Sequence, residues 1–78
     1  MSYDPLPAIR ELRAMIEVKH ANDRLAIDAL RGAEEELMRG DPIDDVRGRV
    51  RFTWGKMRLV SLVDAAASLE LAYWELGR

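Results

Sequence analysis

Apolar and small residues follow a helical spacing through the first half of the chain. Across residues 8–39 they recur three or four positions apart, and this stretch contains no proline and a single glycine. Such spacing places the side chains on one side of an amphipathic helix. The pattern predicts a helix over residues 8–39, after an extended lead-in over residues 1–7 that contains two prolines. The apolar positions are Ile9, Leu12, Ile16, Ala26, Leu30, Ala33 and Leu37.

A tight turn separates this segment from a second helical segment. Gly40 is suited to end the first helix, and Asp41-Pro42 is suited to supply the N-cap and first residue of the next. Beyond the turn the same spacing continues without a slip, which predicts a second helix over residues 42–76, antiparallel to the first. Its positions are Ile43, Val46, Val50, Thr53, Met57, Val60, Asp64, Ala67, Leu71 and Trp74.

Residues 48–55 also allow a strand. Apolar and polar side chains alternate there, and the glycine at each end disfavours a helix by about 1 kcal/mol. A strand would place Val50, Phe52 and Trp54 on one face and Arg49, Arg51 and Thr53 on the other. A lone strand needs a partner, however, and the sequence offers no second strand. The unbroken helical spacing therefore favours the helix, with a kink allowed near Gly55.

Each predicted helix carries a second apolar stripe that a two-helix hairpin leaves uncovered. On the first helix it comprises Ala14, Val18, Ala21, Leu25, Ala29 and Gly32, and on the second Phe52, Leu59, Leu62, Ala66, Leu69, Tyr73 and Leu76. The strip suited to water on the second helix is Arg58, Ser61, Ala65, Ser68, Ala72 and Glu75. Exposing both stripes would be unusual for a monomer. We therefore predict an all-α fold, one helical-hairpin domain over residues 8–78 that forms a homodimer as a four-helix bundle.

Composition limits the class of protein. With 78 residues, of which 49% are hydrophobic and 33% charged, the chain suits one globular domain. The absence of cysteine excludes disulfides and thiolate metal sites. The N-terminus lacks the pattern of a secretory signal, and the most apolar stretch, residues 59–76, is interrupted by charged residues. We expect a cytoplasmic protein without a membrane segment.

Charge is unevenly distributed along the chain. The net charge is −2, yet residues 46–58 hold five of the 12 basic residues, none of the 14 acidic residues, and two aromatic residues. Arginine beside an exposed ring suits a protein interface, and it also suits phosphate contacts with base stacking. We predict a partner-binding surface formed by Arg47, Arg49, Arg51, Trp54, Lys56 and Arg58. In the alternative, Phe52 and Trp54 belong to the core and the arginines pair with the acidic run Glu34–Glu36.

The sequence gives little evidence for catalysis or for a bound cofactor. Glu17 and His20 have the Glu-x-x-His spacing of di-iron bundles, but that short pattern arises often by chance and the second helix lacks an inward glutamate. The consecutive carboxylates of Glu34–Glu36 fan around a helix and do not converge on one ion. His20 is the only histidine, and neither serine of the second helix lies on a glycine-rich turn. We expect no enzyme activity, metal or cofactor.

Function is then inferred from size and the absence of a site. Small helical proteins of this kind often regulate or inhibit larger complexes, and many are encoded by phages and mobile elements, including anti-CRISPR proteins and transcription inhibitors. We expect a non-enzymatic regulator that binds a protein partner and acts sterically or by displacing a subunit. The alternative is a dimeric transcriptional regulator that binds DNA or RNA through residues 47–58, with phosphate contacts that are sensitive to salt.

Overall fold

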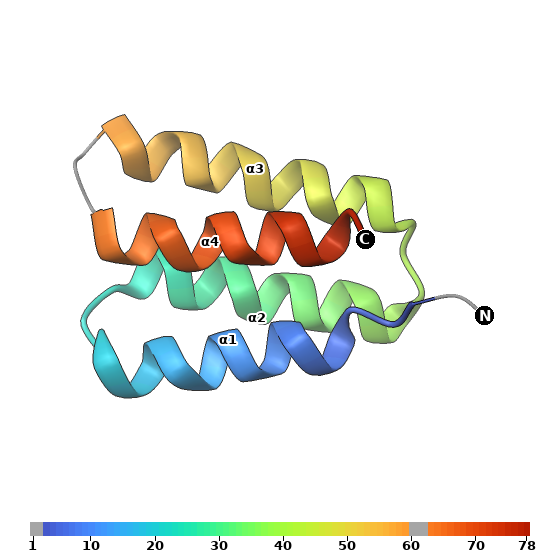
Figure 1. The fold of residues 1–78 in the computed structure, drawn as a ribbon, viewed down its shortest axis with the longest axis horizontal. Helices are drawn as coiled ribbons and strands as arrows, with labels where there is room; N and C mark the ends of the chain where they lie inside the picture. The colour runs from blue at the N-terminus through green and yellow to red at the C-terminus, as the bar shows by residue number, and fades with distance from the viewer. Residues whose placement is uncertain (1–2, 60–62) are drawn as a thin grey trace.

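The chain folds as four helices that run up and down around one core (Figure 1). The computed structural model describes residues 3–59 and 63–78. The helices are α1 (Leu6–Lys19), α2 (Arg24–Arg39), α3 (Ile43–Leu59) and α4 (Val63–Leu76). Each helix packs on the next, α4 closes against α1, and α2 meets α4 across the centre. The radius of gyration is 11.5 Å, about the value expected for a compact domain of this length.

The predicted first helix is in fact two helices. α1 ends at Lys19, and the amide of His20 caps it by donating to the carbonyl of Ile16 at 2.8 Å. Asp23 occupies the N-cap position of α2 with a non-helical backbone conformation (φ −87°, ψ 70°). Asparagine and aspartate favour turns and helix N-caps, so Asn22-Asp23 is the sequence signal for this break. The continuous apolar spacing across it concealed that signal.

The predicted second helix is also two helices. α3 ends at Leu59, and α4 begins at Val63 and returns antiparallel beside α3 (Figure 1). The predicted register therefore fails along α4. Positions expected to face a hairpin partner are exposed there, namely Ala67, Leu71 and Trp74. Positions expected to face water are buried, namely Ala65, Ser68 and Ala72. The predictions for the side chains of Val60, Ser61, Leu62 and Asp64 lie outside the described residues.

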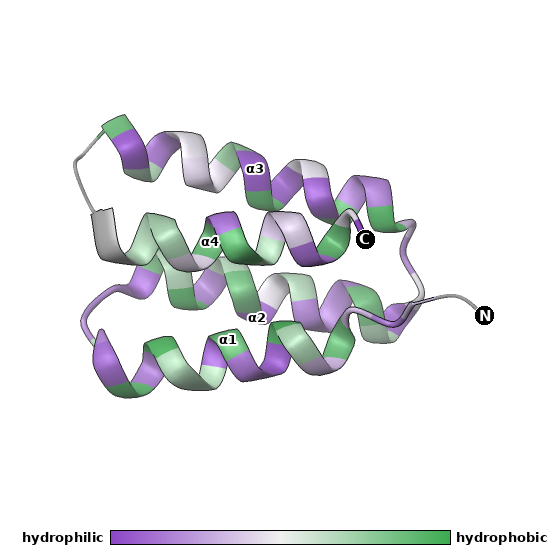
Figure 2. Ribbon diagram, in the orientation of Figure 1, coloured by the Kyte–Doolittle hydropathy of each residue, from purple (hydrophilic) through white to green (hydrophobic). Residues whose placement is uncertain are grey.

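One chain supplies all four helices of the core. The largest fully buried side chains are Ile9, Ile16, Leu30, Val46, Val50, Met57 and Leu69. Buried alanines let the helices approach closely, namely Ala26, Ala33, Ala65, Ala66 and Ala72. Figure 2 shows α4 richer in hydrophobic residues than α3. The prediction of a two-helix hairpin that must dimerise is therefore wrong, because four helices of one chain close the core. Of the second stripe, Ala66, Leu69 and Leu76 are buried in that core, whereas Val18, Leu25, Phe52 and Leu59 stay exposed.

The ends of α3 explain why residues 43–59 form a helix despite two internal glycines. Gly40 ends α2 in the left-handed conformation (φ 87°), which confirms the predicted turn. Asp44 and Asp45 lie in the first turn of α3, and Lys56 and Arg58 lie in its last turn. These charges oppose the helix dipole at both ends and so stabilise the helix. The strand alternative for residues 48–55 is thus excluded.

The N-terminal lead-in is shorter than the seven residues predicted. α1 begins at Leu6, whose amide donates to the side chain of Asp4 at 3.0 Å. The hydroxyl of Tyr3 donates to the carboxylate of Glu75, which ties the lead-in to α4 and raises the pKa of Tyr3. Over residues 3–59 and 63–78, none of the helices combines the length and apolar character needed to cross a membrane.

Candidate functional site

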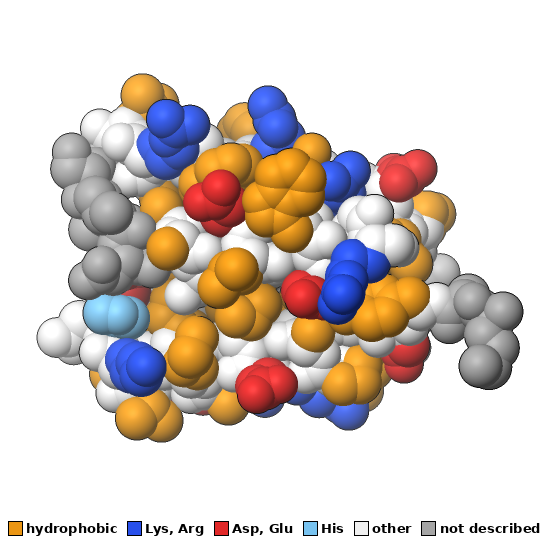
Figure 3. Space-filling view, in the orientation of Figure 1, with side chains coloured by type: hydrophobic (Ala, Val, Ile, Leu, Met, Phe, Trp, Pro, Cys, Tyr) orange, Lys and Arg blue, Asp and Glu red, His pale blue; other side chains and the backbone are white. Residues whose placement is uncertain are grey.

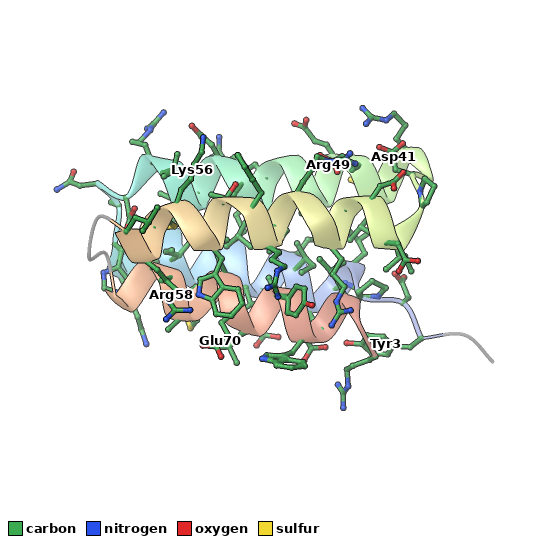
Figure 4. All side chains as sticks on the ribbon, turned by 90° about the horizontal axis from the view of Figure 1, so that it is seen from above. Tyr3, Asp41, Arg49, Lys56, Arg58 and Glu70 are labelled. Carbon is green, nitrogen blue, oxygen red and sulfur yellow. The ribbon has the colours of Figure 1, made fainter. Side chains whose placement is uncertain are left out.

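The predicted partner-binding residues lie on both sides of α3. Residues on a helix are separated by 100° per position, so a basic run of this length spreads around the axis. Figure 4 shows Arg58 on the side of α3 that faces α4, and Arg49 and Lys56 on the side that faces α2. The structure therefore divides the predicted surface into two flanks instead of one ridge.

A cation–aromatic cluster fills the α4 flank. We use this name for Arg47, Arg51, Trp54, Arg58 and Tyr73. The rings of Trp54 and Tyr73 are 6.0 Å apart between centroids and tilted by 38°. The guanidinium carbon of Arg47 lies 3.9 Å from the Tyr73 centroid and that of Arg51 lies 5.7 Å from it, while that of Arg58 lies 5.9 Å from the Trp54 centroid. Each cation–ring contact contributes about 0.5–1 kcal/mol at an exposed site.

The side chain of Arg47 contacts the C-terminal end of α4. Its Nε donates to the carbonyl oxygen of Tyr73 at 3.1 Å. That carbonyl belongs to the last turn of α4, where carbonyls lack the usual partner within the helix. The guanidinium also lies over Gly77, since a Cβ added there would come within 2.5 Å of its Nη2. Arg47 therefore caps α4 from the neighbouring helix.

Arg49 is engaged on the α2 flank. Its Nε donates to Oε2 of Glu36 at 2.7 Å, and its Nη2 lies 3.5 Å from Oδ2 of Asp41. Asp41 also accepts hydrogen bonds from Arg39, which lower the pKa of Asp41, and the charge of Arg49 lowers it further. The expected pairing of the basic segment with Glu34–Glu36 thus holds for Arg49 and Glu36.

The remaining basic residues of the segment are Arg51, Lys56 and Arg58. None of them forms an ion pair with a carboxylate in the described part of the chain. All three are exposed, and Nζ of Lys56 lies 4.7 Å from the centroid of Phe52. Their charge is therefore available to a partner.

An apolar stripe runs along α3 between the two flanks. We call Gly48, Phe52, Gly55 and Leu59 the outer stripe. Phe52 is 66% exposed and Leu59 is 86% exposed. A Cβ added at Gly48 or Gly55 would meet no atom within 4 Å, so both glycines face open space. Phe52 and Leu59 were predicted to lie in a dimer interface, and the single-chain bundle leaves both of them uncovered. The two glycines disfavour a helix in the sequence pattern, so their place in this stripe was not predicted.

Trp54 points away from the outer stripe. Its indole is partly buried and packs against the core beside Tyr73, whereas Phe52 faces outward. Residues two positions apart on a helix diverge by about 200°, so the two rings cannot share a face. The alternative that placed both rings in the core is wrong for Phe52, whereas Trp54 is partly buried at the edge of the core.

The face over α1 and α4 also exposes apolar side chains. Figure 3 shows hydrophobic side chains spread over it among acidic and basic ones. Leu71 is 53% exposed there and Trp74 is 58% exposed, next to the exposed Glu70. This face supplies matched exposed positions for control substitutions.

Glu17 and Glu34, two of the acidic residues considered as metal ligands, are held by arginines. Glu34 accepts hydrogen bonds from Arg10 (2.9 Å) and Arg13 (2.7 Å), and Glu17 accepts from Arg13 and Arg31. Burial raises the pKa of Glu34, but the two arginines outweigh it and leave this pKa lowered. The hydrogen bond from Arg31 is the main cause of the lowered pKa of Glu17. Within residues 3–59 and 63–78, no group of three or more acidic residues or histidine is placed to hold a metal ion.

Comparison of the chain with protein-family models, with curated proteins and with solved structures found no match.

Proposed function

We propose that the protein is a non-enzymatic regulator that binds another protein through the α3 surface and blocks a larger complex sterically. The observation that carries this proposal is the combination on α3 of exposed apolar residues with basic residues that have no carboxylate partner among the described residues. Exposed aromatic and arginine side chains on a rigid element are typical of binding hot spots. By analogy with small helical inhibitors, the proposal extends to one encoded by a phage or mobile element, such as an anti-CRISPR protein or a transcription inhibitor.

The closed core favours steric docking over displacement of a subunit. The subunit-displacement mechanism required an exposed apolar seam on each hairpin. In the structure, α4 contributes residues to the buried core of the same chain. The α3 surface remains for a partner. Because Arg51, Lys56 and Arg58 are its available cations, the expected partner surface is acidic.

Nucleic-acid binding is the second candidate, and the engaged arginines weaken it. Arg47 caps α4 and Arg49 pairs with Glu36, so only part of the basic segment is available for phosphates. A plot of log affinity against log salt concentration has a slope of about −0.9 for each phosphate contact. Three available cations correspond to a slope of about −2.7, which is shallower than that of a protein with about six to ten phosphate contacts.

A tagged pull-down from host lysate, with and without nuclease, tests the proposal. Wild type is compared with Arg51→Glu/Arg58→Glu, which reverses charge on the α4 flank without breaking an ion pair between described residues. Arg24→Glu is the control, because Arg24 is exposed on another helix and has no such pair either. We expect a stoichiometric protein partner that survives nuclease, persists with Arg24→Glu and is lost with the double variant. Recovery of nucleic acid, with proteins lost on nuclease treatment, would support the second candidate instead.

A further inference from the structure

We propose that the outer stripe of α3 is the docking site for an acidic amphipathic helix of the partner. This inference rests on the proposed function, because it assumes that α3 binds a protein. It adds the secondary structure of the bound segment, the spacing of its apolar residues and the sign of its flanking charges.

The spacing of the outer stripe matches a helix. Gly48 and Gly55 are seven residues apart, which is two turns or about 10.5 Å along the axis. Phe52 rises between them and Leu59 rises one turn beyond Gly55, so gaps and bulky side chains alternate. Bulky side chains of a second helix, repeated at three- and four-residue spacing, enter such gaps and straddle Phe52. Glycine at both gaps lets the two backbones approach closely.

An extended peptide does not suit the same surface. Extended segments usually bind by adding a strand to an open sheet edge, where backbone hydrogen bonds supply affinity. The described part of this chain contains helices and no strand. A helix satisfies its own backbone and needs only side-chain contacts, which is what the outer stripe offers.

The charges beside the stripe determine the charge of the partner. Arg58 lies on the side that faces α4 and Lys56 on the other (Figure 4), and Arg51 reaches the ring of Tyr73 on the α4 side. None of the three has an ion pair with a described carboxylate. Acidic residues flanking the apolar face of a bound helix would complement both sides. Asp44 and Asp45 are exposed at the start of α3. They repel acids there, so the acidic residues of the partner belong opposite the later part of the stripe.

A second copy of the chain is a poorer occupant. Pairing α3 with α3 of another copy would bring the cations beside one stripe close to those beside the other. Like charges placed together across an interface cost several kcal/mol. The bulky residues and the gaps would complement each other in such a pair, but the charges would not. The charge pattern therefore favours an acidic partner of a different sequence.

Labelled synthetic peptides provide the test. The probe is a peptide of about 18 residues with leucines along one face and glutamates flanking them, long enough to cover α3 at about 1.5 Å per residue. A scrambled peptide of the same composition disperses the apolar face but keeps the charge. A short DNA duplex and vesicles containing phosphatidylserine represent the other classes of anionic partner. Binding is measured by fluorescence anisotropy, and amide shifts of the 78-residue chain identify the contacted residues.

The key variant is Gly48→Gln/Gly55→Gln, which fills both gaps and leaves every charge in place. Its control is Ala67→Gln, at an exposed position of α4. We expect the amphipathic peptide to bind wild type at least about 10-fold more tightly than the scrambled one, with shifts centred on Phe52 and Leu59. Filling the gaps should remove that preference, and Ala67→Gln should keep it. Because glutamine favours helix over glycine, the melting temperature of the key variant should not fall, which separates lost docking from lost folding.

The outcomes distinguish this inference from the proposed function. Equal binding of both peptides, abolished by Arg51→Glu/Arg58→Glu, would overturn the helix-docking inference and leave a charge-driven protein surface. If the amphipathic peptide bound Gly48→Gln/Gly55→Gln as tightly as it binds wild type, that result would also overturn the helix-docking inference. Binding of the duplex or the vesicles without binding of either peptide would overturn the inference and the proposed function together.

Discussion

At the residue scale, the environment of each arginine matters more than its place in the basic segment. Arg47 and Arg51 both approach the ring of Tyr73, but only Arg47 also donates to the backbone of α4 and covers Gly77. A planar guanidinium can stack and donate at the same time, which a lysine cannot do. Arg47 therefore contributes to folding, while Arg51 remains available for binding.

Arg47→Ala tests that difference. We expect it to lower the free energy of unfolding by about 1–2 kcal/mol, because it leaves a carbonyl at the end of α4 without its partner. For a domain of this size each kcal/mol corresponds to about 4–8 °C in melting temperature. Arg51→Ala, the matched control, removes one exposed cation–ring contact and no backbone hydrogen bond, so it should lower stability by only about 0.5 kcal/mol. Thermal and urea unfolding followed by circular dichroism measure both, and equal losses would contradict the capping role.

Glu34 links α1 to α2 through Arg10 and Arg13, and this link predicts a dependence on pH. The pKa of Glu34 is lowered in the folded chain, despite burial, because both arginines favour the carboxylate. Its contribution to stability is therefore fully present above the ordinary glutamate pKa of about 4.3 and is lost as pH falls through the lower folded value.

Glu34→Gln should flatten the fall in unfolding free energy between about pH 5 and pH 3. Glu35→Gln is the control, since Glu35 is exposed and forms no ion pair with a described residue. Urea unfolding at several pH values provides the measurement. Parallel pH profiles for wild type and Glu34→Gln would show that the arginine link does not contribute to acid sensitivity.

At the element scale, α3 keeps two glycines at exposed positions where alanine would make a better helix. Nothing lies within 4 Å of a Cβ at Gly48 or Gly55. Gly48→Ala and Gly55→Ala should each raise the free energy of unfolding by about 1 kcal/mol. Gly40→Ala should lower it, because Gly40 has a φ of 87° that disfavours a Cβ. Thermal unfolding of the three variants checks the signs, and a loss of stability at Gly48 or Gly55 would mean that these positions are not open.

Sequence periodicity predicted helix throughout the chain but misplaced the helix breaks. The turn at Gly40 was predictable because glycine, aspartate and proline each have a position there that suits them. The break before α2 has the weaker signal Asn22-Asp23, and α3 and α4 are separated by Val-Ser-Leu, which contains no glycine or proline. Apolar spacing that continues across a break cannot reveal that the chain has turned back. The register of α4 was wrong for that reason.

The candidate site was predictable only in part for a related reason. The sequence locates the basic segment, and helix geometry then separates Phe52 from Trp54, but which ring faces inward depends on where α4 packs. The contact of Arg47 with Tyr73 joins residues far apart in sequence, so no local pattern predicts it. The outer stripe exists because α3 is continuous through both glycines, which brings Gly48, Phe52 and Gly55 onto one face.

At the scale of the whole molecule, covering the core with four helices of one chain removes the need for a second copy. The extents of 37 × 23 × 18 Å describe a complete small bundle, and its buried side chains come from all four helices. What stays exposed on α3 is flanked by like charges, which oppose self-pairing. A monomer whose α3 exposes apolar residues beside cations is thus the state from which partner binding would start.

Light scattering at micromolar concentration should therefore report the monomer mass of 8.9 kDa. The mass should stay at this value as the salt concentration is lowered, because weaker screening strengthens the repulsion between copies. Phe52→Ser/Leu59→Ser is the informative variant, because it removes the apolar part of the outer stripe while every charge remains. Leu71→Ser, on the exposed face of α4, is its control. A wild-type species of twice the monomer mass that reverts only with the outer-stripe variant would show that α3 pairs with itself, and the argument from like charges would then be wrong.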